Sequence, residues 1–251
     1  MSKEQNCPPR LNEEPCSATA AGESTASAGM AVAIDGPVGA GKSTIARECA
    51  KRLGFVYMDT GALYRAVGVF CKENDVDAYN EKAVEDILNK ITLEIKLIDG
   101  VQYIIINNND VTGKLRTPEA SMLASKVSSY GAVREFLLDL QRDFALKNNV
   151  VMDGRDIGTV ILPNAKVKIF LSADPRERAR RRFEELKEKG GSDISVSFDE
   201  VLADLEKRDK DDSSRAHAPL KQAEDAILLD TTEFNFEQSV EKIMEIIKQK
   251  I

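Results

Sequence analysis

Residues 36–44 read Gly36-Pro37-Val38-Gly39-Ala40-Gly41-Lys42-Ser43-Thr44 and match the pattern Gly-x-x-x-x-Gly-Lys-Ser/Thr. They follow the apolar run Met-Ala-Val-Ala-Ile at residues 30–34, which is typical of a buried parallel strand. Glycines let the backbone curl closely enough to point its N–H groups at phosphate oxygens. The stretch therefore predicts an α/β fold in which these nine residues cradle the phosphates of a nucleoside triphosphate.

The residues that follow the loop support this prediction. Apolar residues recur at helical spacing from Ile45 to Leu53, and Gly54 stands at the expected C-cap. The loop then opens a helix, whose N-terminal dipole adds to the anion site. Lys42 is expected to reach the β- and γ-phosphates, and Ser43 to ligate Mg²⁺. A glycine-rich turn that binds nothing would not require this order of strand, loop and helix.

Composition limits the class of protein. The chain has 251 residues and a formal net charge of −7, which suits one α/β core with small insertions. Its acidic balance argues against a general binder of nucleic acids or anionic membranes, since these need a basic surface. We also find no apolar run near the ~20 residues of a membrane span. We expect small-molecule partners, with no nucleic acid and no membrane.

The cysteines and the N-terminal segment suggest a cytoplasmic location. The four cysteines form no Cys-x-x-Cys pair and are expected to be free thiols in a reducing cytosol. Residues 1–29 carry acidic groups, prolines and small residues without the apolar segment of a secretory signal. They are predicted to form a flexible N-terminal tail.

Further strands and helices complete the predicted domain. A second strand–loop–helix unit begins at residue 55, and later short apolar runs at 150–152, 167–171 and 226–229 are expected strands. About five parallel strands with helices on both faces predict a doubly wound sheet. Alternating residues on either side of Asp99-Gly100 instead predict an antiparallel hairpin, which is foreign to such a sheet. We therefore predict a domain over 30–251, with a core of 30–74, 148–175 and 216–251, an insertion at about 75–147 and a highly charged helix at 176–189.

Arginines at the ends of predicted elements indicate what kind of second ligand binds opposite the phosphate loop. Arg65 and Arg155 follow strands, and Arg208 and Arg215 flank a segment predicted to be a charged loop. Phosphoryl transfer is helped by fixed positive charge around the migrating group. Each arginine alone could equally be a solvated surface residue. Together with the loop, they suggest two phosphorylated ligands that face each other.

Three segments resemble the bacterial cytidylate kinase family. They are Asp-Thr-Gly-Ala-Leu-Tyr-Arg at 59–65, Asp-Gly-Arg-Asp-Ile-Gly-Thr at 153–159, and Arg208-Asp209 with Arg215-Ala216. The resemblance runs from about Met30 to the C-terminus and leaves the tail outside the pattern. It implies a P-loop nucleoside monophosphate kinase that transfers the γ-phosphoryl group of ATP to CMP or dCMP with Mg²⁺. The insertion would bind the acceptor, and residues 176–192 would form a short lid.

The resemblance also implies a role for each site residue. Catalysis would fall to Lys42, Arg155, Arg178 and Arg182, of which Arg178 and Arg182 share one face of the lid helix, and Gly190-Gly191 would let the lid move. The acceptor phosphate would be held by Arg65, Arg155 and Arg215, its base by Ser125, Arg134 and Asp156, and its ribose by Arg208 and Asp212, with Thr60 in the same acceptor site. Asp153 would orient Mg²⁺ through water, although an Asp at this position also suits a cap in a tight turn.

Two alternatives stay open at this point. Within the same class, the acceptor could be UMP or another small molecule. A different class is a P-loop regulatory NTPase, although the Asn-Lys-x-Asp segment that reads guanine does not occur in the sequence. The identity of the donor base comes from the resemblance alone. A monomer is the simplest expectation.

Overall fold

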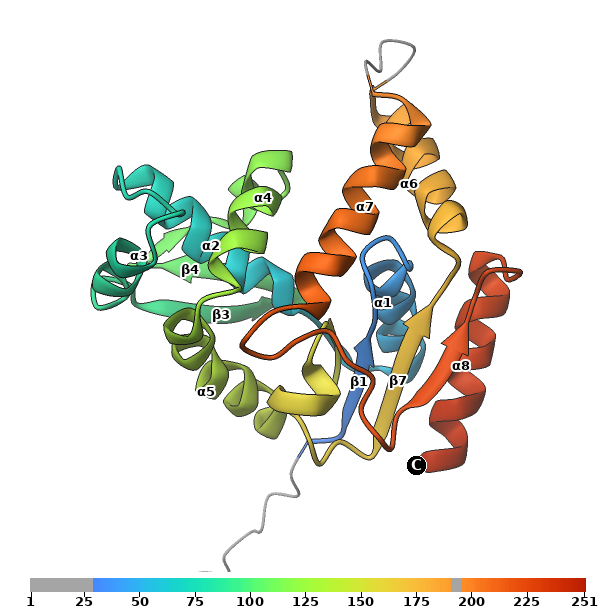
Figure 1. Ribbon diagram of the computed structural model, residues 1–251. Coiled ribbons are helices and arrows are strands. Elements are labelled where there is room, and N and C mark those ends of the chain that lie inside the picture. The colour runs from blue at the N-terminus through green and yellow to red at the C-terminus, as the bar shows by residue number, and fades with distance from the viewer. Residues whose placement is uncertain (1–28, 191–195) are drawn as a thin grey trace, which may run out of the picture.

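The computed structural model describes residues 29–190 and 196–251 (Figure 1). Apart from Gly29, the predicted tail lies outside the described residues, as does Gly191 of the predicted lid glycines. Along the described ranges, no helix combines the length and the apolarity needed to cross a membrane.

A five-stranded parallel sheet forms the centre of the molecule. Its order is β2 (Val56–Asp59), β6 (Val150–Gly154), β1 (Ala31–Asp35), β7 (Val167–Ser172) and β8 (Ile227–Asp230). Strand β1 lies between β6 and β7, with Asp35 opposite both Gly154 and Phe170. The predicted parallel sheet is confirmed, and its central strand leads directly into the phosphate-binding loop.

Helices cover both faces of this sheet. In β1, Val32 and Ile34 belong to a core shared with α1 (Lys42–Leu53) and α8 (Phe236–Lys250). Ala33 faces the opposite way, into the core that includes α2 (Thr60–Glu73) and α5 (Gly131–Lys147). Because successive side chains of a strand point to opposite faces, a central strand needs apolar residues throughout. This alternation explains the uninterrupted apolar run in the sequence.

The insertion forms a small antiparallel sheet with its own helices (Figure 1). It contains α3 (Glu81–Leu88), β3 (Leu93–Ile98), β4 (Val101–Ile106), β5 (Asn109–Asp110), the 3₁₀ turn η1 (Thr112–Lys114) and α4 (Pro118–Val127). The predicted hairpin is confirmed: Ile98 pairs with Val101, and Asp99 and Gly100 have φ angles of 52° and 74°. Two positive φ angles are what a two-residue hairpin turn requires. Strand β5 is too short to produce a sequence pattern.

Two long helices, α6 (Pro175–Gly190) and α7 (Phe198–Ser213), project together beyond the sheet (Figure 1). Ala179, Val201 and Leu205 form the small core between them. The prediction of a charged loop after Arg208 was wrong, because α7 continues to Ser213. Its start is marked by a capping box in which Ser197 and Glu200 satisfy each other's backbone N–H groups.

Candidate active site

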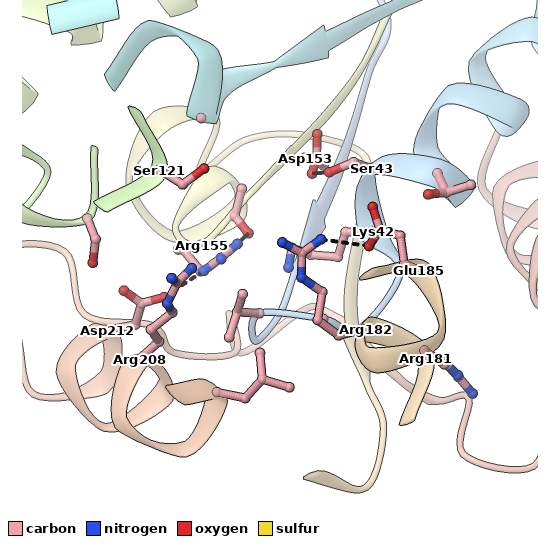
Figure 2. Close-up of a pocket in the computed structure, with 18 of the residues that line it drawn as sticks. Lys42, Ser43, Ser121, Asp153, Arg155, Arg181, Arg182, Glu185, Arg208 and Asp212 are labelled. Atoms are coloured by element: carbon pink, nitrogen blue, oxygen red, sulfur yellow. Dashed lines mark hydrogen bonds and ion pairs between the residues drawn. The ribbon is translucent and has the colours of Figure 1, made fainter. Parts of the chain in front are cut away.

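One cleft of about 1080 Å³ brings both predicted ligand sites together. Its walls include the phosphate loop, the segments after β2 and β6, and helices α4, α6 and α7. Every predicted acceptor residue lines it: Thr60, Arg65, Ser125, Arg134, Arg155, Asp156, Arg208, Asp212 and Arg215. In Figure 2, Arg155, Arg208 and Asp212 lie across the cleft from Lys42, Ser43 and Asp153, with Arg182 between the two groups.

The phosphate loop has a conformation that requires glycine. Gly36 has a φ of 149°, and a Cβ there would lie 2.0 Å from the carbonyl oxygen of Leu171. Gly41 is the N-cap of α1 with a φ of 81°. These positions let the backbone turn tightly between β1 and α1, so the first N–H groups of the helix face the cleft.

Lys42 is buried at the start of α1. Its Nζ donates a hydrogen bond to the carbonyl oxygen of Pro37 at 2.6 Å, and the residue is only 5% exposed. Burial, together with the charge of Arg155, lowers the pKa of Lys42 to about 7. A bound polyphosphate would favour the charged form of this lysine, which is how it can stabilise the donor.

Ser43 and Asp153 place a hydroxyl and a carboxylate side by side next to the loop. The Ser43 hydroxyl donates to Oδ2 of Asp153 at 2.7 Å, and the Tyr57 hydroxyl donates to Oδ1 at the same distance. Burial and the neighbouring charge of Asp59 raise the pKa of Asp153. A hydroxyl and a carboxylate are hard oxygen donors of the kind that Mg²⁺ uses together with substrate phosphates. Sequence reasoning missed Tyr57, because a tyrosine in a strand gives no signal of its partner.

Asp212 holds two of the arginines that are predicted to bind the acceptor phosphate. Its Oδ2 accepts from Nε of Arg155 at 2.7 Å, and its Oδ1 accepts from Arg215. Arg65 is held separately by Asp59, with 2.6 Å between its NH2 and Oδ2. The Nε of Arg65 is buried and has no hydrogen-bond partner among the described residues. The carboxylates thus fix three guanidinium groups while leaving N–H donors for an anion.

Arg134 and Asp156 form another ion pair in the lining of the cleft. Asp156 is 4% exposed, and the Arg134 guanidinium lies 5.4 Å from the ring centre of Tyr64. Burial raises the pKa of Tyr64 to about 12, so its hydroxyl stays protonated. Ser125, on α4, lines the same region. The cluster presents planar donors and acceptors, which suits the edge of a heterocyclic base.

Arg178 and Arg182, which are predicted to act together as a catalytic pair on the lid, lie in different environments in the structure. Arg182 lines the cleft, and Figure 2 shows it extending toward Lys42 while its NH1 donates to Glu185 at 2.8 Å. Arg178 is 3% exposed and lies outside the lining formed by the described residues. It donates to the carbonyl oxygens of Val38 at 2.8 Å and Ala173 at 2.9 Å, and to Asp209 at 2.6 Å. Arg178 therefore stabilises the phosphate loop through its hydrogen bond to Val38 and does not line the cleft.

These features define a P-loop kinase whose acceptor is itself an anion, the class of nucleoside monophosphate kinases. A family model described as cytidylate kinase matches residues 32–249. The cytidylate kinase of Carboxydothermus hydrogenoformans is 51% identical over 221 residues, which cover 88% of this chain and 98% of that protein. That of Caldicellulosiruptor bescii is 48% identical over 215 residues, covering 86% and 94%. The chain belongs to the cytidylate kinase family.

The solved structures give a weaker likeness. A shikimate kinase from Bacteroides thetaiotaomicron has a TM-score of 0.44 and 15% sequence identity, with 87% of this chain and 98% of that chain covered. A likeness of this degree adds nothing to the assignment.

Proposed function

We propose that the chain transfers the γ-phosphoryl group of ATP to CMP and dCMP, giving ADP and CDP or dCDP. The observation that carries the proposal is the single cleft in which the phosphate loop faces the arginines held by Asp212 and Asp59. An attacking phosphate oxygen is already ionised and needs no general base. The protein's contribution is to position both phosphates and to surround the transferred group with charge.

In this proposal, Arg65, Arg155 and Arg215 hold the acceptor phosphate, and Arg208 and Asp212 contact the ribose. Ser43 and Asp153 would hold Mg²⁺, directly or through water, and the ion would neutralise charge on the donor phosphates. Thr60 contributes to the acceptor site; its hydroxyl donates to the backbone carbonyl of Asp153 at 2.8 Å.

Base selection follows from Asp156 and its neighbours. The amino group of cytosine can donate to the Asp156 carboxylate, with Ser125 as a second acceptor, while Arg134 donates to ring acceptors. Uracil would place a carbonyl against the carboxylate and leave it unpaired, at a cost of about 1–3 kcal/mol. This difference favours CMP over UMP as the acceptor.

The predicted lid, residues 176–192, is proposed to close over ATP and carry Arg182 to the transferred group. Closure would keep water from the γ-phosphate. We further propose that the protein acts as a cytoplasmic monomer on small molecules alone. The formal net charge of −7 supports the absence of a nucleic-acid or membrane partner.

A coupled ADP-release assay tests the proposal. ATP and Mg²⁺ would be supplied with CMP, dCMP, UMP, AMP or dTMP separately, beside a control with no acceptor. Turnover with CMP and dCMP, at least tenfold faster than with the others at equal subsaturating concentration, is the expected result. Preference for UMP would favour the alternative acceptor, and ADP release without any acceptor would favour a regulatory NTPase.

A further inference from the structure

Asp35 is a buried carboxylate that the reaction described above does not use. It is the last residue of β1, directly before the phosphate loop, and is 5% exposed. Its Oδ1 accepts from the backbone N–H of Ile157 at 2.8 Å, and its Oδ2 accepts from that of Gly158 at 2.7 Å. Both oxygens are therefore bonded to one segment of chain that lies more than 100 residues away in the sequence.

That segment begins the turn that follows the acceptor residues. Ile157–Ile161 form a single π-helical turn, η2, whose N-cap is Asp156. The N–H groups of Val160 and Ile161 bond to the carbonyl oxygen of Asp156 at 2.9 and 3.2 Å. The first N–H groups of such a turn have no partner within it. Asp35 supplies that partner for Ile157 and Gly158.

The sheet does not need this carboxylate for its own register. The backbone of Asp35 is already aligned with Gly154 of β6 and Phe170 of β7. Burying the carboxylate is also unfavourable: burial raises the pKa of Asp35 to about 6, although the two N–H donors oppose the rise. An apolar residue would be easier to accommodate in a strand buried on both faces. The hydrogen bonds to Ile157 and Gly158 better explain why a carboxylate is present at this position.

We propose that Asp35 is a positioning residue for the acceptor nucleotide, because its two hydrogen bonds fix the turn that presents Arg155 and Asp156 to the cleft. This inference rests on the proposed function. Strand β1 then has two roles. It leads into the phosphate loop at Gly36, and its last residue, Asp35, orients the groups that hold the acceptor phosphate and base.

The test compares the Asp35→Asn variant with the wild type, using the full chain. An amide keeps one acceptor oxygen but points an NH₂ group at one of the two N–H donors. We expect KM for CMP to rise about tenfold, and KM for ATP to change less than about twofold. The kcat/KM ratio of CMP to UMP should also fall. A purely structural defect would affect both substrates alike.

Two further variants complete the experiment. Asp225→Asn is the matched control, since Asp225 is exposed and bonds Lys168 beside η2 without touching the turn; it should behave as wild type. Gly158→Ala leaves Asp35 in place but crowds the turn, because its Cβ would lie 3.1 Å from Cδ of Lys168, which is closer than an ordinary contact. Lys168 is buried and its Nζ is held by Pro163 and Asp225, so the turn has to shift away from Asp35. It should raise KM for CMP selectively, and it decides the question if Asp35→Asn does not fold.

The outcomes separate this inference from the proposed function. Unchanged KM for CMP in folded variants, or equal rises for both substrates, would overturn the role of Asp35 while CMP kinase activity stands. A wild-type protein that does not phosphorylate CMP would overturn both.

Discussion

Nε of Arg155 donates to Oδ2 of Asp212 across 2.7 Å, and this ion pair joins the end of strand β6 to helix α7. Asp212 is 5% exposed and also accepts from Arg215. The acceptor arginines therefore depend on a residue from the second of the two projecting helices, so movement of α7 would change their arrangement.

Replacing Asp212 should weaken acceptor binding. In Asp212→Asn, Arg155 and Arg215 lose the carboxylate that they share, and the nucleotide loses a proposed ribose contact. We therefore expect KM for CMP to rise at least tenfold, with little change in KM for ATP. Asp211→Asn is the matched control, because Asp211 is exposed on the same helix. Steady-state kinetics with each substrate varied in turn provide the measurement. Equal behaviour of the two variants would contradict this role of Asp212.

Arg178 and Arg182 should have separable effects. Arg178→Met leaves Asp209 and two carbonyl oxygens without a buried donor, and should lower the free energy of unfolding by about 3–5 kcal/mol. Arg182→Met should change stability by less than about 0.5 kcal/mol but reduce kcat by at least 100-fold. Denaturant unfolding and kcat are measured for both variants. An Arg178→Met protein that is fully stable but as inactive as Arg182→Met would instead support a catalytic pair.

Donor binding should be linked to proton uptake by Lys42. Since burial lowers the pKa of Lys42 to about 7, this lysine is mostly neutral at pH 8 in the free protein. A bound polyphosphate would raise that pKa again, so ATP binding should be accompanied by proton uptake by this lysine at pH 8. Calorimetry of ATP binding in buffers of different ionisation enthalpy measures the uptake. It should disappear in Lys42→Arg, whose guanidinium is always charged, and a wild type without buffer dependence would contradict the argument.

The sequence predicts those parts of the site that are local in the chain. The phosphate loop, the strand before it and the helix after it lie within one short stretch, so spacing and glycine content suffice. Other contacts join segments that are distant in the sequence, and no residue pattern predicts them. Examples are the pairs Tyr57–Asp153, Arg178–Asp209 and Asp35–Gly158. Arg178 and Arg182 share a helical face by spacing. Packing of α6 against the loop and α7 nevertheless buries one of them and leaves the other in the cleft.

The wrong prediction of a loop after Arg208 has a comparable cause. The region around Arg208 contains so many charged residues that its composition predicts a loop. The apolar pair Val201 and Leu205, at i, i+4 spacing, holds it as a helix against α6. A narrow apolar stripe among charges indicates a helix that packs on a single neighbour.

The most direct test of cytosine recognition is the ratio of kcat/KM for CMP to that for UMP, measured in the wild type and in Asp156→Ala. Removing the carboxylate removes the group that we propose accepts from the cytosine amine and repels the uracil carbonyl. We predict a wild-type ratio of at least tenfold that falls by about tenfold or more in Asp156→Ala. A wild-type ratio near one, or a ratio that Asp156→Ala leaves unchanged, would contradict the assignment of Asp156 and the cytosine site built around it.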